Sequence, residues 1–506
     1  MKKERLYQLV FFASVLGMSV LYDYPSELFR RPHGYHNWRQ CDGATITLNY
    51  YNVSMNFFEP RLNLIENNDG KMVSEFPVIY YLTACLYKVF GFHEFFLRLI
   101  SALIFFSGLY YLFKTISLLL DDSWYGLVLS LMLFTSPLVI DYALNFLPDV
   151  PGLALSFIGF YFFVVYLQNQ NNKSLYISTF WFALAGLLKI TALIGFLSLA
   201  GTIIFVALFY FFKSEKPVCL RNKTALTLFI LLPLVVNVCW IAYVNYYNTT
   251  NNNLYFTTSI RPIWNVGEAK TKEIWAQFDY QWLRMTMYRD FLNTIPFLAG
   301  IALLFYSRKN VPYALWMLFC IIGSVLYVIL FFEQFIVHDY YMICLSILPV
   351  SVIFVLLKRI KEWKFSVFNS YFFKVGLAVL LGVMVHHGYR INSMREKMDY
   401  YTFPEYFSAD KELLKFGIAP DDKVISIGDE STGITLYLMN RRGWTQYGMA
   451  NPVPKSQIES CVQKGASHLL VYKDSDSQLS EEVKKEFLQN LVGTLPGVRI
   501  YKLNNI

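Results

Sequence analysis

The chain has 506 residues, of which 55% are hydrophobic, 18% aromatic and only 16% charged. A soluble domain carries charge on about 25% of its positions, so this composition excludes an ordinary soluble protein and indicates a polytopic membrane protein. The formal net charge of +8 does not require a nucleic-acid partner, because the basic residues fall in loops where membrane topology places them.

Apolar runs long enough to cross a bilayer as helices recur from the N-terminus to about residue 388. The first run follows a basic start, but no small-residue cleavage site follows Tyr22, so we interpret it as a retained span and not as a signal peptide. The sequence predicts eleven spans, at residues 6–22, 97–119, 123–146, 152–168, 174–188, 190–212, 224–246, 289–306, 313–334, 340–357 and 367–388.

Four basic segments set the topology, because cytoplasmic loops are enriched in Lys and Arg. Treating the short apolar segment 78–91 as a twelfth span would place the last three basic segments outside, so we predict a short helix along the outer interface there. With eleven spans the N-terminus is cytoplasmic and the C-terminal region lies outside. The four segments contain Lys2, Lys3 and Arg5; Lys213, Lys216, Arg221 and Lys223; Arg308 and Lys309; and Lys358, Arg359, Lys361 and Lys364.

Ionisable residues within or beside the predicted spans gather near the outer face, and the middles of the spans are nearly free of charge. Because charged groups inside a membrane are costly and usually mark function, this distribution predicts a site at one face and not a pathway through the membrane. These residues are Arg98, Asp141, Asp149, Lys189, Arg289, Asp290, Glu333, His338 and Asp339.

The first external loop, residues 35–75, holds the densest polar and aromatic cluster, including the stretch from His36 to Asp42. Asp42 is the candidate general base, because a carboxylate partly shielded by Trp38 and Tyr50 can take a proton from an attacking hydroxyl. The alternative is that Asp42 caps a juxtamembrane helix beginning at Gly43.

Three residues further along the chain are candidates for the same site. Asp149 lies between Pro148 and Pro151, where a tight turn with a helix N-cap is the alternative. Lys189 interrupts a long apolar run and either snorkels from a helix end or holds a phosphate as a point charge. Arg261 is a second phosphate candidate, although most arginines in such loops face water.

The segment from His338 to Tyr341 opens a predicted span at the outer face. His338, Tyr340 and Tyr341 are candidates for binding a phosphate-bearing substrate, and an interfacial aromatic belt is the alternative. Glu75 and His338 could together hold a divalent metal cation, but one Glu and one His give only a weak metal signal.

The seven cysteines show no paired spacing, which argues against a disulfide framework or a zinc knuckle. Cys41 and Cys461 are both external under this topology, so a bond between them is an open alternative.

The last part of the chain, residues 391–506, has globular charge density and reads as a small α/β domain after a membrane domain of residues 1–390. We predict strands at 423–428, 467–473 and 498–503 and helices at 433–439, 456–465 and 481–492. The segment 428–433 follows a strand, where α/β folds often place ligands, but it lacks the glycine spacing of a dinucleotide loop and is expected to cap the next helix. The domain would then cover the membrane site or help to hold an acceptor.

Several of these motifs together resemble the membrane-embedded GT-C glycosyltransferases. They are Trp38-Arg39-Gln40-Cys41-Asp42, then Glu75-Phe76-Pro77 leading to Tyr87-Lys88-Val89-Phe90-Gly91, then Arg98-Leu99-Ile100-Ser101-Ala102-Leu103, and Pro148-Asp149. The similarity covers roughly residues 1–390. It is greatest to the bacterial relatives of the protein O-mannosyltransferases and of the aminoarabinose transferase that acts on lipid A, in glycosyltransferase family 39.

The resemblance implies a polyprenyl-phosphate-linked sugar donor, inverting transfer on the external face, and a lipid, glycan or protein acceptor. It assigns catalytic acids to Asp42 and Asp149. In the aminoarabinose enzymes a Glu-Lys-Pro triplet supplies a metal ligand and a phosphate-binding lysine. Here the triplet is Glu75-Phe76-Pro77, so phosphate binding is expected from Arg39, Lys189 and Arg261 instead, with or without a metal.

The expected architecture is therefore an all-α GT-C membrane domain with juxtamembrane helices in its first external loop, followed by the α/β domain in the periplasm of a bacterial inner membrane. Two other functions share the hydrophobic composition. A lipid-linked glycan polymerase or ligase would transfer a whole chain from a diphosphate carrier. A flippase or transporter would show charged or broken helices near the membrane centre and often internal symmetry, and neither is evident in the sequence.

Overall fold

The computed structural model describes residues 2–66, 68–209, 222–253, 255–256, 259–304, 310–396 and 402–504, and the chain divides into two compact units. Unit 1 consists of Met1–Phe29, Arg98–Ala242 and Thr258–Glu396. Unit 2 consists of Arg30–Leu97, Tyr243–Thr257 and Lys397–Ile506. The first external loop is thus grouped with the C-terminal domain, whose predicted start at residue 391 falls within a helix of unit 1.

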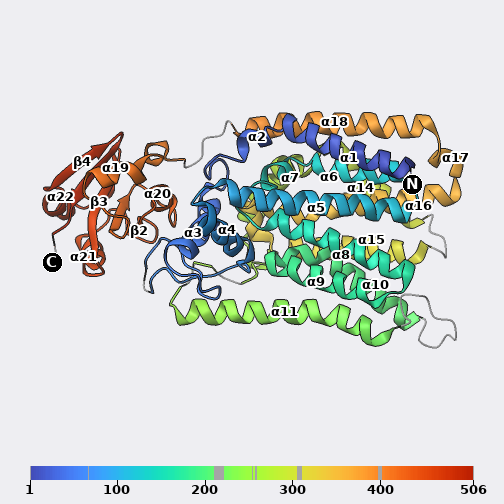
Figure 1. Ribbon diagram of the computed structural model, residues 1–506, viewed down its shortest axis with the longest axis horizontal. Helices are drawn as coiled ribbons and strands as arrows, with labels where there is room; N and C mark the ends of the chain where they lie inside the picture. Colours follow the sequence, from blue (N-terminus) through green and yellow to red (C-terminus); the bar gives the residue numbers. More distant parts are fainter. Residues whose placement is uncertain are drawn as a thin grey trace. The chain divides into compact units, whose positions relative to one another are not determined.

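Unit 1 is helical, and its long helices run alongside one another (Figure 1). Its elements are α1 (Lys2–Leu21), α2 (Tyr24–Glu27), α5 (Phe95–Leu120, beginning in unit 2), α6 (Ser123–Phe134), α7 (Pro137–Tyr142), α8 (Asp149–Asn169), α9 (Asn172–Leu188), η1 (Ile190–Leu193), α10 (Ile194–Phe209), α11 (Lys223–Thr250, ending in unit 2), η3 (Ile263–Asn265), α12 (Glu268–Gln277), η4 (Phe278–Trp282), α13 (Leu283–Thr286), α14 (Arg289–Leu304), α15 (Val311–Leu330), η6 (Phe332–Ile336), η7 (Asp339–Ser346), α16 (Ile347–Trp363), α17 (Phe365–Phe368) and α18 (Tyr371–Glu396).

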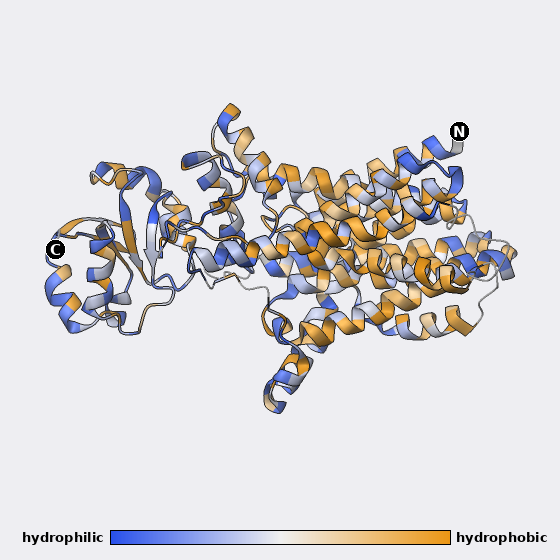
Figure 2. Ribbon diagram, turned by 90° about the horizontal axis from the view of Figure 1, so that it is seen from below, coloured by the Kyte–Doolittle hydropathy of each residue, from blue (hydrophilic) through white to orange (hydrophobic). Residues whose placement is uncertain are grey.

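Eight helical segments in the described ranges are long and apolar enough to cross a membrane. Lipid offers no hydrogen bonds to a backbone, so a continuous apolar helix is the form that satisfies every peptide group. Hydrophobic residues dominate these helices in Figure 2, whereas the C-terminal strands and their helices alternate between hydrophobic and hydrophilic. The eight segments are Glu4–Leu21, Phe95–Leu120, Asp149–Asn169, Ile190–Phe209, Lys223–Thr250, Val311–Leu330, Asp339–Trp363 and Tyr371–Arg395.

The other three predicted spans form shorter helices. Residues 123–146 are divided between α6 and α7, because Ser136 caps α7 by accepting a hydrogen bond from the Val139 amide and Pro137 opens the new helix. Helices α9 and α14 contain 17 and 16 residues. Within the described residues, eight helices therefore meet the length of a full span, and α14 is followed directly by residues that lie outside the described ranges. Five residues of the predicted cytoplasmic loops, Lys213, Lys216, Arg221, Arg308 and Lys309, lie outside the described residues.

Unit 2 contains two helices from the first loop and a five-stranded mixed sheet. The strand order is β2-β1-β3-β5-β4; β1 runs parallel to β2 and β3, and β5 is antiparallel to β3 and β4. Its elements are α3 (Asn37–Asn52), α4 (Val78–Phe90), η8 (Pro404–Tyr406), α19 (Ala409–Lys415), β1 (Lys423–Ile427), α20 (Ile434–Leu438), β2 (Arg442–Thr445), α21 (Lys455–Gln463), β3 (Ala466–Tyr472), η9 (Ser475–Gln478), α22 (Glu481–Phe487), β4 (Leu491–Leu495) and β5 (Val498–Lys502).

The predicted strands at 423–428, 467–473 and 498–503 are confirmed as β1, β3 and β5, and the short helix predicted at 78–91 is α4. The predictions missed β2 and β4. The helix predicted at 481–492 was too long: α22 ends at Phe487, and β4 returns to β5 through a turn in which Gly497 has a φ of +69°. The Pro496-Gly497 pair is the sequence signal for that turn.

The first loop is hydrogen-bonded to the edge of this sheet. The Gly443 amide donates to the Asn63 carbonyl at 2.9 Å, and the Ile65 amide donates to the Gly443 carbonyl at 2.7 Å. A Cβ at Gly443 would lie 1.8 Å from the Val424 carbonyl oxygen, so only glycine fits between the loop and β1. The side chain of Ile65 completes the core of the sheet domain. The loop and the C-terminal domain therefore form one folded unit.

Candidate active site

Asp42 lies within α3, a helix that begins at Asn37 after His36, whose backbone has a φ of +61°. The alternative that Asp42 caps a helix beginning at Gly43 is therefore wrong, because the helix starts one and a half turns earlier and Asp42 is in its interior. The side chain is only 2% exposed. A buried carboxylate at this position needs partners, since an uncompensated charge in an apolar setting is unstable.

Two hydroxyl groups and one guanidinium supply those partners. The Thr432 hydroxyl donates to Asp42 Oδ1 at 2.8 Å, and the Tyr255 hydroxyl donates to Oδ2 at 2.9 Å. Arg39, one helical turn earlier, places Nη1 at 3.7 Å from Oδ2. Burial raises the pKa of Asp42 to about 6; Arg39 and the two hydroxyls lower it, and the Glu75 carboxylate raises it further. The carboxyl is therefore poised to exchange a proton near neutral pH.

Arg39 links Asp42 to Glu75. Its Nη2 lies 2.5 Å from Glu75 Oε2, and its guanidinium carbon lies 5.2 Å from the centre of the Phe256 ring. Glu75, the predicted metal ligand, is thus an ion-pair partner of Arg39. Over the described part of the chain, no group of three or more His, Cys, Asp or Glu side chains forms a metal site. The residues present do not by themselves define a metal centre, and the metal stays a prediction.

An aromatic cluster surrounds the hydrogen bonds of Asp42. The Trp38 and Tyr255 rings are parallel at 6.4 Å, and Tyr447 contacts both rings edge-on at 5.7 and 5.4 Å. Trp38 donates its indole N–H to the Thr432 hydroxyl at 2.6 Å. Thr432, Tyr255 and Tyr447 were all missed from the sequence. Only Thr432 had a signal, because it lies in the segment 428–433 that follows a strand.

That segment also has the capping role that was predicted for it. Asp429 accepts hydrogen bonds from the Ser431 and Thr435 amides, each at 2.8 Å, and from both of their hydroxyls at 2.5 and 2.7 Å. It thereby anchors the start of α20. The possible bond between Cys41 and Cys461 is absent: both are free, buried thiols.

Unit 1 brings together a second group of predicted residues. Asp149 is in the first turn of α8, and Lys189 ends α9 with extended backbone; Lys189 Nζ lies 3.0 Å from Asp149 Oδ1. A Cβ at Gly152 would approach Lys189 Cβ to 3.1 Å, so a small residue lets the two helix ends meet. The ammonium also lies 5.2 and 5.3 Å from the ring centres of Tyr340 and Tyr341.

The same cluster includes His338, whose ring lies 5.2 Å from Tyr340 and 5.8 Å from Tyr341. Asp339, which lies between His338 and Tyr340 in the chain, is fully buried and holds the segment 338–341 in place. It accepts hydrogen bonds from Arg395 and Tyr142, both at 2.6 Å. The predicted candidates Asp149, Lys189, His338, Tyr340 and Tyr341 are therefore neighbours.

Arg261 does not share this arrangement. Its side chain is half exposed, and its ion-pair partner within the described ranges is Glu333, at 3.7 Å. Glu333 is paired more closely with Lys270, at 2.5 Å.

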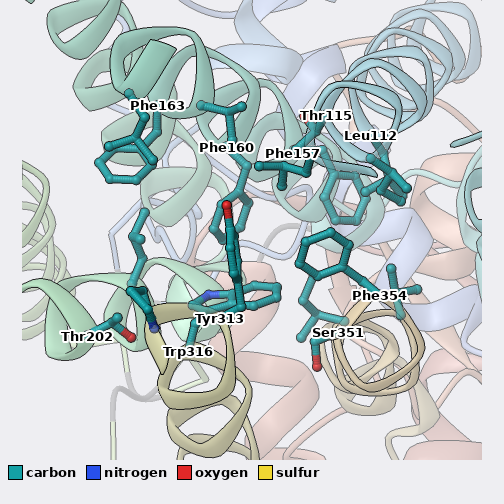
Figure 3. A pocket seen from close by; sticks show the side chains of 18 of the residues that line it. Leu112, Thr115, Phe157, Phe160, Phe163, Thr202, Tyr313, Trp316, Ser351 and Phe354 are labelled. Atoms are coloured by element: carbon teal, nitrogen blue, oxygen red, sulfur yellow. The ribbon is translucent and has the colours of Figure 1, made fainter. Parts of the chain in front are cut away.

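Five helices of unit 1 (α5, α8, α10, α15 and α16) line an apolar cavity of about 360 Å³ (Figure 3). Phe160 and Trp316 are among its walls, with ring centres 5.6 Å apart. The hydroxyls of Thr115, Thr202 and Ser351 each donate to a carbonyl of their own helix at 2.7–2.8 Å. The indole N–H of Trp316 donates to the Gly195 carbonyl on α10 at 3.2 Å. These four polar groups are thus satisfied by backbone carbonyls, and the mostly apolar wall suits a hydrocarbon ligand.

Comparison with solved structures shows the same fold over nearly the whole chain. ArnT from Cupriavidus metallidurans is 14% identical, with 99% of this chain and 98% of ArnT covered; the TM-score is 0.59 for its apo structure and 0.60 for its complex with undecaprenyl phosphate. The arabinofuranosyltransferase AftD from Mycobacteria is 12% identical with a TM-score of 0.57, and the match covers 99% of this chain and 40% of AftD. The GT-C fold predicted from the resemblance is confirmed.

Residues 74–243 match the family model described as dolichyl-phosphate-mannose-protein mannosyltransferase. No curated protein sequence matches the chain. The chain therefore has the fold of ArnT and AftD, and its residues 74–243 are similar to the mannosyltransferase family.

Proposed function

We propose that this enzyme transfers a sugar from a polyprenyl-phosphate donor to an acceptor hydroxyl, with inversion at the anomeric carbon, on the periplasmic face of a bacterial inner membrane. The observation that carries the proposal is the buried Asp42 carboxylate, held by two hydroxyl donors and with a pKa of about 6. The description of the matching family and the undecaprenyl phosphate bound to ArnT support the choice of donor.

The reaction is a single displacement. The acceptor oxygen attacks the anomeric carbon, the bond from that carbon to the phosphate oxygen breaks, and polyprenyl phosphate leaves. Asp42 takes the proton of the acceptor hydroxyl as general base. A carboxylate with a pKa near 6 is largely ionised at neutral pH and is still basic enough to accept that proton.

The leaving phosphate gains negative charge, which a nearby cation stabilises. We assign this role to Lys189, with Tyr340, Tyr341 and His338 as aromatic neighbours that can also contact the donor. Asp149 holds the ammonium at 3.0 Å and so orients it. Arg39 is a further cation beside Asp42, and Arg261 is a more exposed candidate for contact with the donor. No step of this mechanism uses a metal.

The lipid chain of the donor would occupy the apolar cavity. Asp149 is the first residue of α8, and Lys189 and Tyr340 come shortly before α10 and α16 in the chain. Residues of each of these three helices line the cavity, and they follow Asp149, Lys189 and Tyr340 in the chain. Phe163 lies roughly 20 Å beyond Asp149 along α8. A polyprenyl chain is long enough to bridge that distance, and the cavity wall matches its chemistry.

The test is transfer from radiolabelled polyprenyl-phosphate sugars to candidate lipid, glycan and protein acceptors, with the purified enzyme and an Asp42→Asn variant. We expect the variant to lose about 10²–10⁴-fold in rate, because the general base is removed while the side-chain size is kept. Asp474→Asn, at an exposed acid of the C-terminal domain, is the matched control and should keep wild-type turnover. Undiminished transfer by Asp42→Asn would remove Asp42 from the chemistry.

A further inference from the structure

We propose that Thr432 is a positioning residue for sugar transfer: its hydroxyl fixes the Asp42 carboxylate, so that the C-terminal domain completes the active site. This inference rests on the proposed role of Asp42 as general base. It goes beyond that role by assigning a catalytic purpose to a domain that follows the membrane helices.

The direction of the hydrogen bonds at Thr432 is determined by chemistry. The indole N–H of Trp38 can only donate, so the Thr432 oxygen accepts from it, at 2.6 Å. The hydroxyl proton then points to Asp42 Oδ1 at 2.8 Å. An ionised carboxylate can only accept, so Thr432 is the donor of this bond and accepts from Trp38 at the same time. The Tyr255 hydroxyl also interacts with Thr432.

Thr432 and Asp42 are both held in place. Thr432 is 1% exposed, and Asp42 is 2% exposed. The loop that carries Thr432 is anchored on both sides, because Asp429 binds Ser431 and Thr435 on either flank. Thr445 on the neighbouring strand β2 also donates to the Ser431 carbonyl. The position of the Thr432 hydroxyl is therefore set by the fold of the sheet domain.

The arrangement still leaves Asp42 able to act. Tyr255 occupies one lone pair of Oδ2 and Thr432 one lone pair of Oδ1, and an ionised carboxylate has about four acceptor sites. The two hydroxyls hold the plane of the carboxylate, and the remaining lone pairs can receive the acceptor's proton. Fixing a reacting group in this way is a recognised source of rate enhancement.

The experiment compares Thr432→Val, which removes the hydroxyl while keeping the shape, with Thr432→Ser, which keeps the hydroxyl. Thr494→Val, at an exposed position of β4, is the control for the same substitution in the same domain. We expect Thr432→Val to lower kcat about 10- to 100-fold with little change in donor KM, and Thr432→Ser to restore most of the rate. Thr494→Val should behave as wild type.

The pH profile provides a readout that loss of folding would not produce. The titratable and charged groups around Asp42 are Arg39 and Cys41 on the same helix, Glu75 before α4, Tyr255 after α11 and Tyr447 after β2. The Thr432 hydrogen bond lowers the pKa of Asp42, so its removal should move the acid limb of kcat against pH to higher pH. Thr432→Ser should return the limb to its wild-type position.

The outcomes separate the two proposals. If Asp42→Asn is inactive while Thr432→Val has wild-type kcat and pH profile, Thr432 has no positioning role and the proposed function stands. If Asp42→Asn remains active, the proposed role of Asp42 as general base is wrong, and the inference about Thr432, which rests on it, is wrong as well. A Thr432→Val variant that loses rate, keeps its melting temperature and shifts its acid limb supports the inference.

Discussion

At the scale of single residues, the fold shields the Asp42 carboxylate from water. Asp42 is almost completely buried, and burial raises its pKa to about 6, well above the ordinary value for aspartate. The charge of Arg39 and the hydrogen bonds from Thr432 and Tyr255 lower the pKa and so limit this increase. The balance produces a base that is ionised at neutral pH but near its titration point.

Activity should therefore fall as pH decreases through about 6. The raised pKa means that Asp42 takes up its proton at a higher pH than an exposed aspartate, and the protonated form cannot act as a base. The check is kcat/KM for the donor between pH 4.5 and 9, with circular dichroism at each pH to exclude unfolding. A rate that stays constant down to pH 4.5 would contradict this assignment.

At the scale of elements, the residues of unit 1 that we propose for donor binding lie at helix ends. Asp149 begins α8, Lys189 ends α9, and His338 to Tyr341 lie where η7 begins. Side chains at helix ends can pair and still face a ligand, whereas groups in the middle of a packed span are enclosed by neighbouring helices. Arg395, near the end of α18, fastens this region by binding Asp339 at 2.6 Å and Asp141 at 2.5 Å.

Replacing Lys189 by Gln should raise the donor KM about tenfold or more, because a cation for the phosphate is lost. The single change also leaves the buried Asp149 without its ammonium, which costs about 3–5 kcal/mol of unfolding free energy. The double variant Lys189→Gln/Asp149→Asn should recover stability but not donor affinity. Donor titration and thermal unfolding of the three proteins check this. A double variant with wild-type KM would show that Lys189 does not bind the donor.

At the scale of the whole molecule, the apolar composition does two things. It forms helices that suit a bilayer, and in unit 1 it leaves a cavity with a hydrocarbon wall between five of them. In unit 2, the first loop and the sheet domain share a core and a strand edge, although residues 97 and 397 are far apart in the chain. The membrane helices thus lie between the first loop and the sheet domain in the sequence, although these two segments fold together as one unit.

Filling the cavity should weaken binding of long-chain donors. Ser351 on α16 lines it, and a Ser351→Phe variant would place a ring where several methylene groups of the lipid would lie. Each buried methylene contributes about 0.8 kcal/mol, so KM for a long polyprenyl donor should rise about tenfold or more. A short-chain donor analogue should be unaffected, and Ala13→Phe on the exposed face of α1 serves as control. Equal effects on short and long donors would contradict the cavity's role.

The sequence by itself determined the membrane class, the helical architecture and most of the C-terminal strands, and it marked Asp42, Asp149 and Lys189 as candidate site residues, whose roles stay predictions. These features follow from local patterns: apolar runs of bilayer length, period-two strands, and charges at the ends of apolar segments. Tertiary structure alone decided the partners of Asp42. Thr432 is 390 residues from Asp42 and Tyr255 is 213 residues from it, and no local pattern marks a hydroxyl whose role is set by a distant carboxylate. The strand β2 was missed for the same reason, because the short segment Arg442–Thr445 becomes a strand by pairing with β1 and with the first loop.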